Sequence, residues 1–187
     1  MQSMTVSGQF NYAMMMSIMG GLIITAPYIF YQIWSFIKPG LKKNELRAAK
    51  GLVFYVSLCF FLGVLFGYFV VAPLTVQFFG SFQISPEIEN NFTVGSYMGT
   101  VISTVFYTGI LFLLPIVSFI LTKIGLIGPE FLKKYRRHAI VVILIISAVI
   151  TPPDMLSQII VSIPIIVLYE IGIVVSTRTS KNKNPIE

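Results

Sequence analysis

The sequence predicts an all-α fold, that of a polytopic helical membrane protein. Only 11% of its 187 residues are charged and 56% are hydrophobic, and the mean hydropathy is +0.86. A soluble domain would carry roughly a quarter charged residues. The few charges also gather in short segments between long apolar runs, as loops between membrane-spanning helices do. We therefore expect a single integral membrane domain, residues 1–187, with five membrane helices, the last two of them short.

The first predicted helix covers residues 10–37 and follows an outer segment at 1–9. This run has no charged side chain and exceeds the about 20 residues that cross a bilayer. Tyr28, Tyr31 and Trp34 lie toward its end, as aromatic residues at a membrane interface do. A strongly basic loop follows it and indicates the cytoplasmic side.

The second predicted helix covers residues 51–76. It contains Gly63 and Gly67 in GxxxG spacing, which is a weak signal and more often reflects helix packing than a dimer contact. The loop after it contains Glu87 and Glu89 but no Lys or Arg. This loop therefore belongs on the side opposite the basic one.

The third predicted helix covers residues 95–122. The uncharged run that contains it begins earlier, and we expect its first part, TVGSYM at 93–98, to lie along the outer surface before the helix enters the membrane. Pro115 removes a backbone hydrogen bond and is expected to kink the helix.

The motif TPPD, residues 151–154, separates the last two predicted helices, 136–151 and 155–176. Two consecutive prolines end a helix, and Asp154 can cap the next one by accepting from its first backbone N–H groups. Even with two further residues at its start, the fourth helix is only about 27 Å long, below the ~30 Å hydrocarbon core. It must thin the bilayer locally, extend its Arg and Lys side chains to the membrane surface, or sit in a recess. Residues 177–187 are expected to form a cytoplasmic tail.

The basic residues predict the orientation of the chain. All 13 Lys and Arg residues fall into three segments, 38–50, 123–137 and 178–183, which five helices place on one side. The positive-inside rule then predicts a cytoplasmic C-terminus and an outer N-terminus. Because the chain would begin outside with no visible signal, we expect it to be the remainder of a longer protein that has a preceding helix.

Several classes of function are not expected. The net charge of +6 lies in short loops rather than on one basic face, which argues against nucleic-acid binding. Cys59 is the single cysteine, so no intrachain disulfide can form. No catalytic motif is present, and the single histidine, His138, fits a solvated residue at the membrane interface. We expect no catalytic residues, no cofactor and no metal site.

Two carboxylates are candidate functional residues, and each has two interpretations. Asn44 can cap the next helix with Glu45 in its first turn, favoured by the helix dipole. Alternatively, Glu45 can bind a guanidinium group in bidentate fashion, provided that it points away from the five cations near it. Glu170 is the only ionisable residue well inside a predicted helix. It is either a functional acid or a carboxyl that is protonated or paired at a helix contact.

Five stretches of sequence are similar to one family, in the same order and over nearly the whole chain. They are PYIFYQIWSFIKPGLKKNE (27–45), FGYFVVAPL (66–74), TPPDMLSQ (151–158), SIP (162–164) and YEIG (169–172). On these residues the chain resembles the TatC family, the core multispanning subunit of the twin-arginine protein translocase. The combination of TPPD after a short helix with the PGL…E loop is specific.

This resemblance implies six helices folded into a concave cup, so that the present chain would lack the first family helix. It implies a non-enzymatic receptor in the bacterial cytoplasmic (inner) membrane that recognises the twin-arginine signal peptides of folded cargo proteins. Together with TatA/TatB-type single-span subunits and other TatC copies, it would nucleate export driven by the proton motive force.

The resemblance also assigns roles to individual residues. Glu45 matches the acid that recognises the arginine pair, and Thr151 and Gln158 match the polar contact site for partner helices. Asp154 matches an acid of the outer cap. Asp154 and Glu170 are the two expected functional acids. The expected neighbours of Glu45 in the signal-peptide site are Phe36, Leu41, Lys43 and Arg47.

Two adjacent residues depart from the family pattern. Leu113 and Leu114 stand before Pro115, where many members carry Glu or Gln. A polar recess inside the cup is then either missing or supplied by Glu170. The alternative function is a small-solute membrane permease that uses Glu170 as its coupling carboxylate; it is disfavoured by the lack of an internal repeat.

Overall fold

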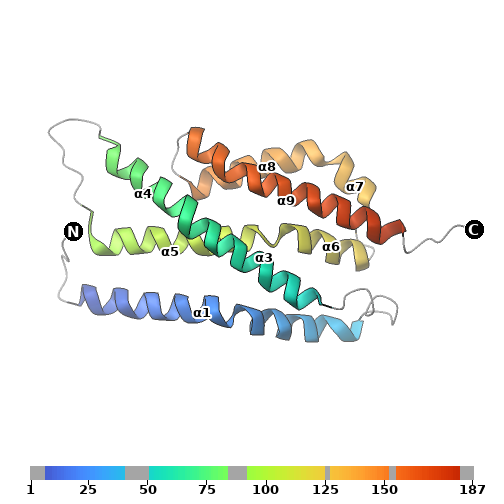
Figure 1. Ribbon diagram of the computed structural model, residues 1–187, viewed down its shortest axis with the longest axis horizontal. Coiled ribbons are helices and arrows are strands. Elements are labelled where there is room, and N and C mark those ends of the chain that lie inside the picture. The colour runs from blue at the N-terminus through green and yellow to red at the C-terminus, as the bar shows by residue number, and fades with distance from the viewer. Residues whose placement is uncertain (1–6, 41–50, 84–91, 125–126, 152–154, 182–187) are drawn as a thin grey trace, which may run out of the picture.

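The structure is a computed structural model that describes residues 7–40, 51–83, 92–124, 127–151 and 155–181. The described part is all-helical, and Figure 1 shows long helices that lie side by side. This agrees with the physics of a chain in lipid, where each backbone N–H and C=O group must bond within its own helix. The helices are α1 (Gly8–Ile37), α3 (Leu52–Phe66), α4 (Ala72–Ser81), α5 (Val94–Leu111), α6 (Leu114–Ile124), α7 (Pro129–Lys134), α8 (Arg136–Ile150) and α9 (Met155–Lys181).

Four helical stretches in the described residues are long and apolar enough to cross a membrane: Gly8–Gly40, Leu52–Ser81, Val94–Thr122 and Ser157–Arg178. The fourth predicted helix corresponds to α8, which has 15 residues and is therefore about 22 Å long. It is short, as expected, but too short to count as a span by length. The number of five spans and the cup shape stay predictions.

Helix α1 is the least enclosed of the spans, with only 6% of its most apolar stretch buried. It packs along α3 and α5, and the rings of Phe30 and Phe60 meet edge to face with their centroids 5.4 Å apart. Pro27 lies inside α1 without ending it, which membrane helices tolerate because neighbouring groups satisfy the freed carbonyl.

The glycine pair of the second span packs within the protein. A Cβ added to Gly63 would lie 2.7 Å from Phe112 Cβ and 2.9 Å from Gly109 Cα, and one on Gly67 would lie 2.9 Å from Val105 Cα. Only glycine lets α3 approach α5 this closely. The GxxxG spacing is thus a packing contact within one chain, the interpretation that the sequence favoured.

A π-helical segment, Gly67–Val71, was not predicted from the sequence and joins α3 to α4 in one continuous span. Such a segment carries one extra residue per turn and shifts the faces of the residues after it. Val71, the last residue of this segment, and Thr75, one turn later, are both buried.

The third span begins earlier than predicted. Thr93 caps α5 by accepting a hydrogen bond from the Ser96 backbone N–H at 3.2 Å, and Val94 is already helical. TVGSYM therefore forms the cap and first turns of α5, not a segment that runs along the surface before the helix. The helix is interrupted at Phe112 and Leu113, just before Pro115, and continues as α6.

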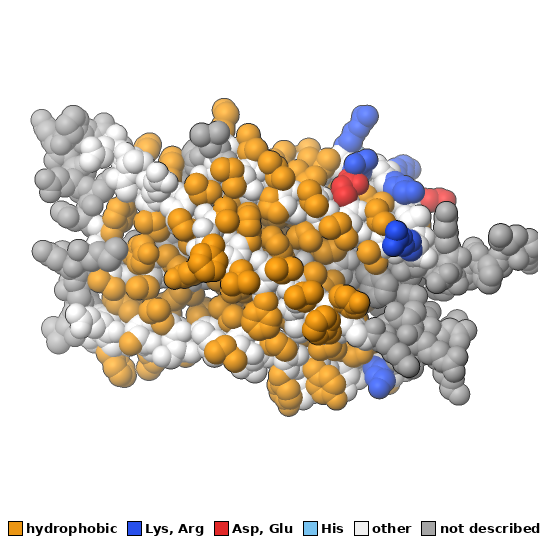
Figure 2. All heavy atoms as spheres, in the orientation of Figure 1, with side chains coloured by type: hydrophobic (Ala, Val, Ile, Leu, Met, Phe, Trp, Pro, Cys, Tyr) orange, Lys and Arg blue, Asp and Glu red, His pale blue; other side chains and the backbone are white. Residues whose placement is uncertain are grey.

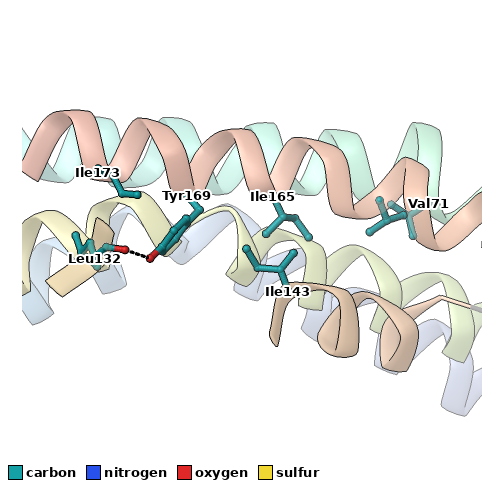
Figure 3. Packing of buried hydrophobic residues seen from close by; sticks show 7 residues of the cluster. Val71, Leu132, Ile143, Ile165, Tyr169 and Ile173 are labelled. Carbon is teal, nitrogen blue, oxygen red and sulfur yellow. Dashed lines mark hydrogen bonds between the residues drawn. The ribbon is translucent and has the colours of Figure 1, made fainter. Parts of the chain in front are cut away.

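The core lies where α9 packs between α6 and the pair α7 and α8. Gly172 of α9 lies against Pro115: a Cβ added to Gly172 would be 3.2 Å from the Pro115 Cα. The hydroxyls of Thr122 and Ser176 share a hydrogen bond of 2.7 Å. Figure 3 shows the buried side chains of this core pointing toward one another. The core cluster consists of Val71, Leu132, Ile143, Val161, Ile165, Tyr169 and Ile173.

Helix α9 has 27 residues and continues to Lys181, beyond the predicted end at 176, so the prediction that the last helix is short was wrong. No proline or glycine interrupts residues 173–181, and the Thr177 hydroxyl donates to the Ile173 carbonyl at 2.8 Å. Arg178 and Lys181 therefore belong to a helix that extends past the apolar stretch. The prediction that they lie in the tail was wrong.

Candidate functional site

Charged side chains gather at one end of the helix bundle, which we call the charged end. Figure 2 shows them together at the end where α1 and α9 finish and α8 begins. The three basic segments of the sequence thus lead to a common end of the structure. Among the residues whose side chains the structure describes, the charged end contains Lys38, Glu130, Lys133, Lys134, Arg136, Arg137, Glu170 and Arg178.

The predicted signal-peptide site falls largely outside the described residues. Phe36 lies in the last turn of α1 and is 86% exposed. The other predicted residues, Leu41, Lys43, Glu45 and Arg47, lie outside the described ranges. The two borders of their loop are described: α1 with its short 3-10 turn ends at Gly40, and α3 begins at Leu52.

Gly51, just before α3, has a φ angle of 82°, which side chains with a Cβ rarely adopt. The left-handed conformation turns the chain directly into α3. The residue that the sequence analysis considered as a cap, Asn44, is not the one before α3; it lies outside the described residues.

An apolar pocket of about 220 Å³ lies between α1, α3 and α6. Ile37, the last residue of α1, and Leu52, the first of α3, line it, so the pocket adjoins both borders of the basic loop. Leu113, one of the two residues that depart from the family pattern, also lines this pocket. Every lining side chain is apolar, including Trp34. A polar recess therefore does not occur at Leu113.

Glu170 forms an ion pair with Arg136, between its Oε1 and the Nε of the guanidinium. From the sequence, Glu170 was expected well inside a span, either as a functional acid or as a carboxyl that is protonated or paired at a helix contact. In the structure its side chain is 33% exposed and its partner begins the neighbouring helix α8. The carboxylate thus lies at the charged end, and it links α9 to α8.

The adjacent residue, Tyr169, makes a second link to the same region. Its hydroxyl donates to the Leu132 carbonyl of α7 at 2.9 Å, as the dashed line in Figure 3 shows. Tyr169 and Leu132 are both buried. Residues 169 and 170 together therefore hold α7 and the start of α8 against α9.

The two predicted partner-contact residues, Thr151 and Gln158, lie together and both bond to α8. The Thr151 hydroxyl donates to the Ser147 carbonyl at 2.8 Å, and the Gln158 amide donates to the Leu144 carbonyl at 3.1 Å. Gln158 thereby joins α9 to α8 across the TPPD break. Asp154 lies outside the described residues.

A recess of about 470 Å³, which was not predicted from the sequence, lies between α4, α5 and the end of α8. Hydroxyl groups and glycines line much of it, among them Gly99 and Ser103 of α5, Thr75 of α4 and Thr151 after α8. The repeated four-residue spacing of Gly95, Gly99 and Ser103 could have indicated this face. The described residues contain no group of three or more His, Cys, Asp or Glu that could hold a metal ion.

Comparison with known proteins identifies relatives over almost the whole chain. The family model described as Sec-independent protein translocase protein (TatC) matches residues 1–164. The TatC of a Blattabacterium from Periplaneta americana is 42% identical over 97% of this chain and 68% of its own length. The TatC of Halothiobacillus neapolitanus is 37% identical over 98% of this chain, which spans 50% of that relative. The chain thus spans from half to about two thirds of these relatives.

Two solved structures are also similar to this chain. One is a crystal structure of the twin arginine translocase receptor TatC in DDM, with a TM-score of 0.76 and 35% identity; the match covers 94% of this chain and 78% of that one. A second crystal structure of the twin arginine translocase receptor TatC gives a TM-score of 0.74 and 34% identity over 96% of this chain and 79% of that one.

Proposed function

The chain belongs to the TatC family of Sec-independent protein translocase proteins, and on this premise we propose that it binds twin-arginine signal peptides at its charged end. The binding site comprises Glu45 as the acceptor of the arginine pair, with Phe36, Leu41, Lys43 and Arg47 around it. The bound cargo is a folded protein, and the charged end, including the C-terminus, faces the cytoplasm.

The observation that supports this role most is the setting of the loop that carries Glu45. Its borders, Gly40 and Gly51, lie at the charged end, beside the strongly exposed ring of Phe36 and the apolar pocket under Ile37 and Leu52. A carboxylate there can accept two parallel hydrogen bonds from a guanidinium, while an apolar surface lies within reach of the residues that follow it. A basic peptide with an apolar segment matches both features.

We further propose that Thr151 and Gln158 contact single-span subunits of the TatA/TatB type, and that several copies of the chain assemble in the cytoplasmic membrane. Thr151 lines a recess at the end of α8, and Gln158 lies one α9 turn after the helix begins. Polar groups at such a place can exchange hydrogen bonds with a polar residue of a neighbouring membrane helix. Asp154, beside them in sequence, is proposed as an acid of the outer cap.

The alternative role, a solute permease coupled through Glu170, has less support. A coupling carboxylate has to gain and lose its proton inside the membrane. Glu170 instead pairs with Arg136 at the charged end.

The test is photocrosslinking of a twin-arginine signal peptide to a benzophenone side chain at position 36, in membranes that contain the assembled translocase. We expect Glu45→Gln to remove most of the crosslink. The matched control is Glu130→Gln, which neutralises an exposed acid at the same end and leaves the crosslink intact. Full crosslinking with Glu45→Gln would refute the proposed role of Glu45.

A further inference from the structure

Basic and aromatic side chains share one exposed surface where α7 meets α8, which we call the corner surface. Its exposed members are Phe131, Lys133, Lys134, Tyr135, Arg137 and His138. The ring centroids of Phe131 and Tyr135 are 4.4 Å apart, and those of Tyr135 and His138 are 5.6 Å apart. The three rings therefore form a continuous row from α7 into α8, at the end of the apolar bundle where aromatic residues meet lipid headgroups.

The positive charge of the corner surface is only partly neutralised within the protein. Arg136 pairs with Glu170, and among the described side chains this is the one ion pair of the region. The two lysines of α7 and Arg137 have no such partner there. Glu130 is the single carboxylate that α7 and α8 themselves contribute. Because like charges this close repel one another, a negative charge supplied from outside would be favourable.

An exposed apolar face of α8 begins directly at the corner surface. Val142, Ile145 and Val149 are exposed and follow His138 at intervals of four, three and four residues. Side chains at these intervals lie on one helix face. From His138 to Val149 this face extends about 16 Å, roughly half of the ~30 Å hydrocarbon core. Its length therefore matches one leaflet of the bilayer.

We propose that the corner surface binds the headgroup of an anionic phospholipid, whose acyl chain lies along this face of α8. The phosphate supplies the missing negative charge and accepts charge-assisted hydrogen bonds from Lys134 and Arg137. A soluble anion would match only the basic side chains, and an apolar partner helix only the face of α8. A phospholipid matches both, in the order in which they follow each other. This binding does not depend on the proposed signal-peptide site.

Tryptophan fluorescence tests the proposal, because Trp34 is the single tryptophan of the chain. With Trp34→Phe, the substitution Ile145→Trp places one fluorophore on the apolar face, about 10 Å along α8 from His138. The purified full chain is reconstituted without other proteins into mixed vesicles of phosphatidylglycerol and phosphatidylcholine. One or the other lipid carries brominated acyl chains, which quench tryptophan on contact. The quenching gives the binding constant of the anionic lipid relative to the zwitterionic lipid.

Tyr31→Trp in the same Trp34→Phe background is the matched control reporter. Tyr31 is 54% exposed, against 58% for Ile145. It lies about 10 Å along α1 from Lys38, which directly follows that helix at the charged end. Figure 1 shows α1 and α7 on opposite sides of the bundle. The two reporters therefore share depth and exposure, and only one adjoins the corner surface.

We expect the relative binding constant at position 145 to exceed that at position 31 by about threefold or more at low ionic strength. Lys134→Gln combined with Arg137→Gln should lower it to the value at position 31. Lys38→Gln combined with Lys42→Gln removes as many cations from the segment after α1 and should leave the value at position 145 unchanged. If the Ile145→Trp variant folds poorly, Val142→Trp reports on the same face.

Three results would overturn the proposal. Equal relative constants at positions 145 and 31 would show that the corner surface does not select anionic lipid. A preference that survives Lys134→Gln with Arg137→Gln would place the selective site elsewhere. A tryptophan at position 145 that neither brominated lipid quenches would mean that a second copy of the chain, and not lipid, covers this face of α8.

Discussion

Arg136, the first residue of α8, binds the carboxylate of Glu170 in α9 through its Nε atom. The two residues are far apart in the sequence, and the pair holds the first turn of α8 beside Glu170 of α9. With the Tyr169 hydroxyl bond to Leu132, it secures the short α7 and α8 against the long α9. The charged end thus contains a structural ion pair beside the loop for which we propose a binding role.

The ion pair is expected to stabilise the fold modestly. Both side chains are partly exposed, and such pairs contribute about 0.2–1 kcal/mol. Glu170→Gln and Arg136→Gln should each lower the thermal midpoint slightly, and the double variant should lose less than the sum of the two. A double-mutant cycle on the detergent-solubilised protein measures this coupling. Strict additivity would show that the pair makes no energetic contribution.

Tyr169→Phe should be more costly than its small chemical change suggests. The substitution removes the hydroxyl that donates to the Leu132 carbonyl at 2.9 Å and leaves that buried acceptor unpaired. We expect a loss of about 0.5–1.5 kcal/mol in unfolding free energy. Tyr55→Phe is the control, because Tyr55 is 60% exposed, and it should change stability by less than about 0.5 kcal/mol. Equal effects of the two variants would contradict the predicted link between α7 and α9.

Gly63→Ala should disrupt the contact between α3 and α5. The new methyl group would lie 2.7 Å from Phe112 Cβ and 2.9 Å from the Gly109 backbone, so the helices must separate. Overpacking of this kind costs about 1–3 kcal/mol. Gly20→Ala on α1 meets no atom within 4 Å and should be neutral or slightly stabilising. Thermal unfolding of the two variants, side by side, checks the prediction; it fails if Gly63→Ala unfolds at the wild-type temperature.

The proposed signal-peptide site predicts a preference for arginine over lysine that depends on Glu45. A peptide whose arginine pair is replaced by lysines should bind the wild-type protein about tenfold more weakly or worse, because lysine lacks the bidentate geometry. With Glu45→Gln, the two peptides should bind about equally. Titration of labelled peptides at constant ionic strength measures the four affinities. An unchanged preference in the variant would assign arginine recognition to another residue.

Much of the fold was predictable, because the necessary signals are local. The uncharged runs locate the helices, the prolines at 115, 152 and 153 locate their interruptions, and the three basic segments meet at one end of the bundle. The sequence also indicated that α8 would be short. Each of these features depends only on neighbouring residues and on the length of an apolar run.

The misplaced features depend on neighbours in space. TVGSYM was expected at the surface because the uncharged run that begins with it is longer than a membrane span requires, but Thr93 caps α5 and the following residues are helical. Likewise, Glu170 was placed well inside a helix from the sequence, although it pairs with Arg136 at the start of α8. The apolar lining around Leu113 agrees with the loss of polarity at that position, and the recess with hydroxyl groups in its lining lies nearer the opposite end.

The sequence by itself determined that this chain is a helical membrane protein of the TatC family, where its helices break and which ends carry the basic charge. Only the tertiary structure decided that the glycine pair packs on α5, that Arg136 and Glu170 meet, and that hydroxyls of α4, of α5 and of Thr151 line one recess. The physical reason is that nearly every face of a membrane helix is apolar, so the hydrophobic pattern alone does not reveal which face meets another helix. That choice is made by close packing between segments that are remote in the chain.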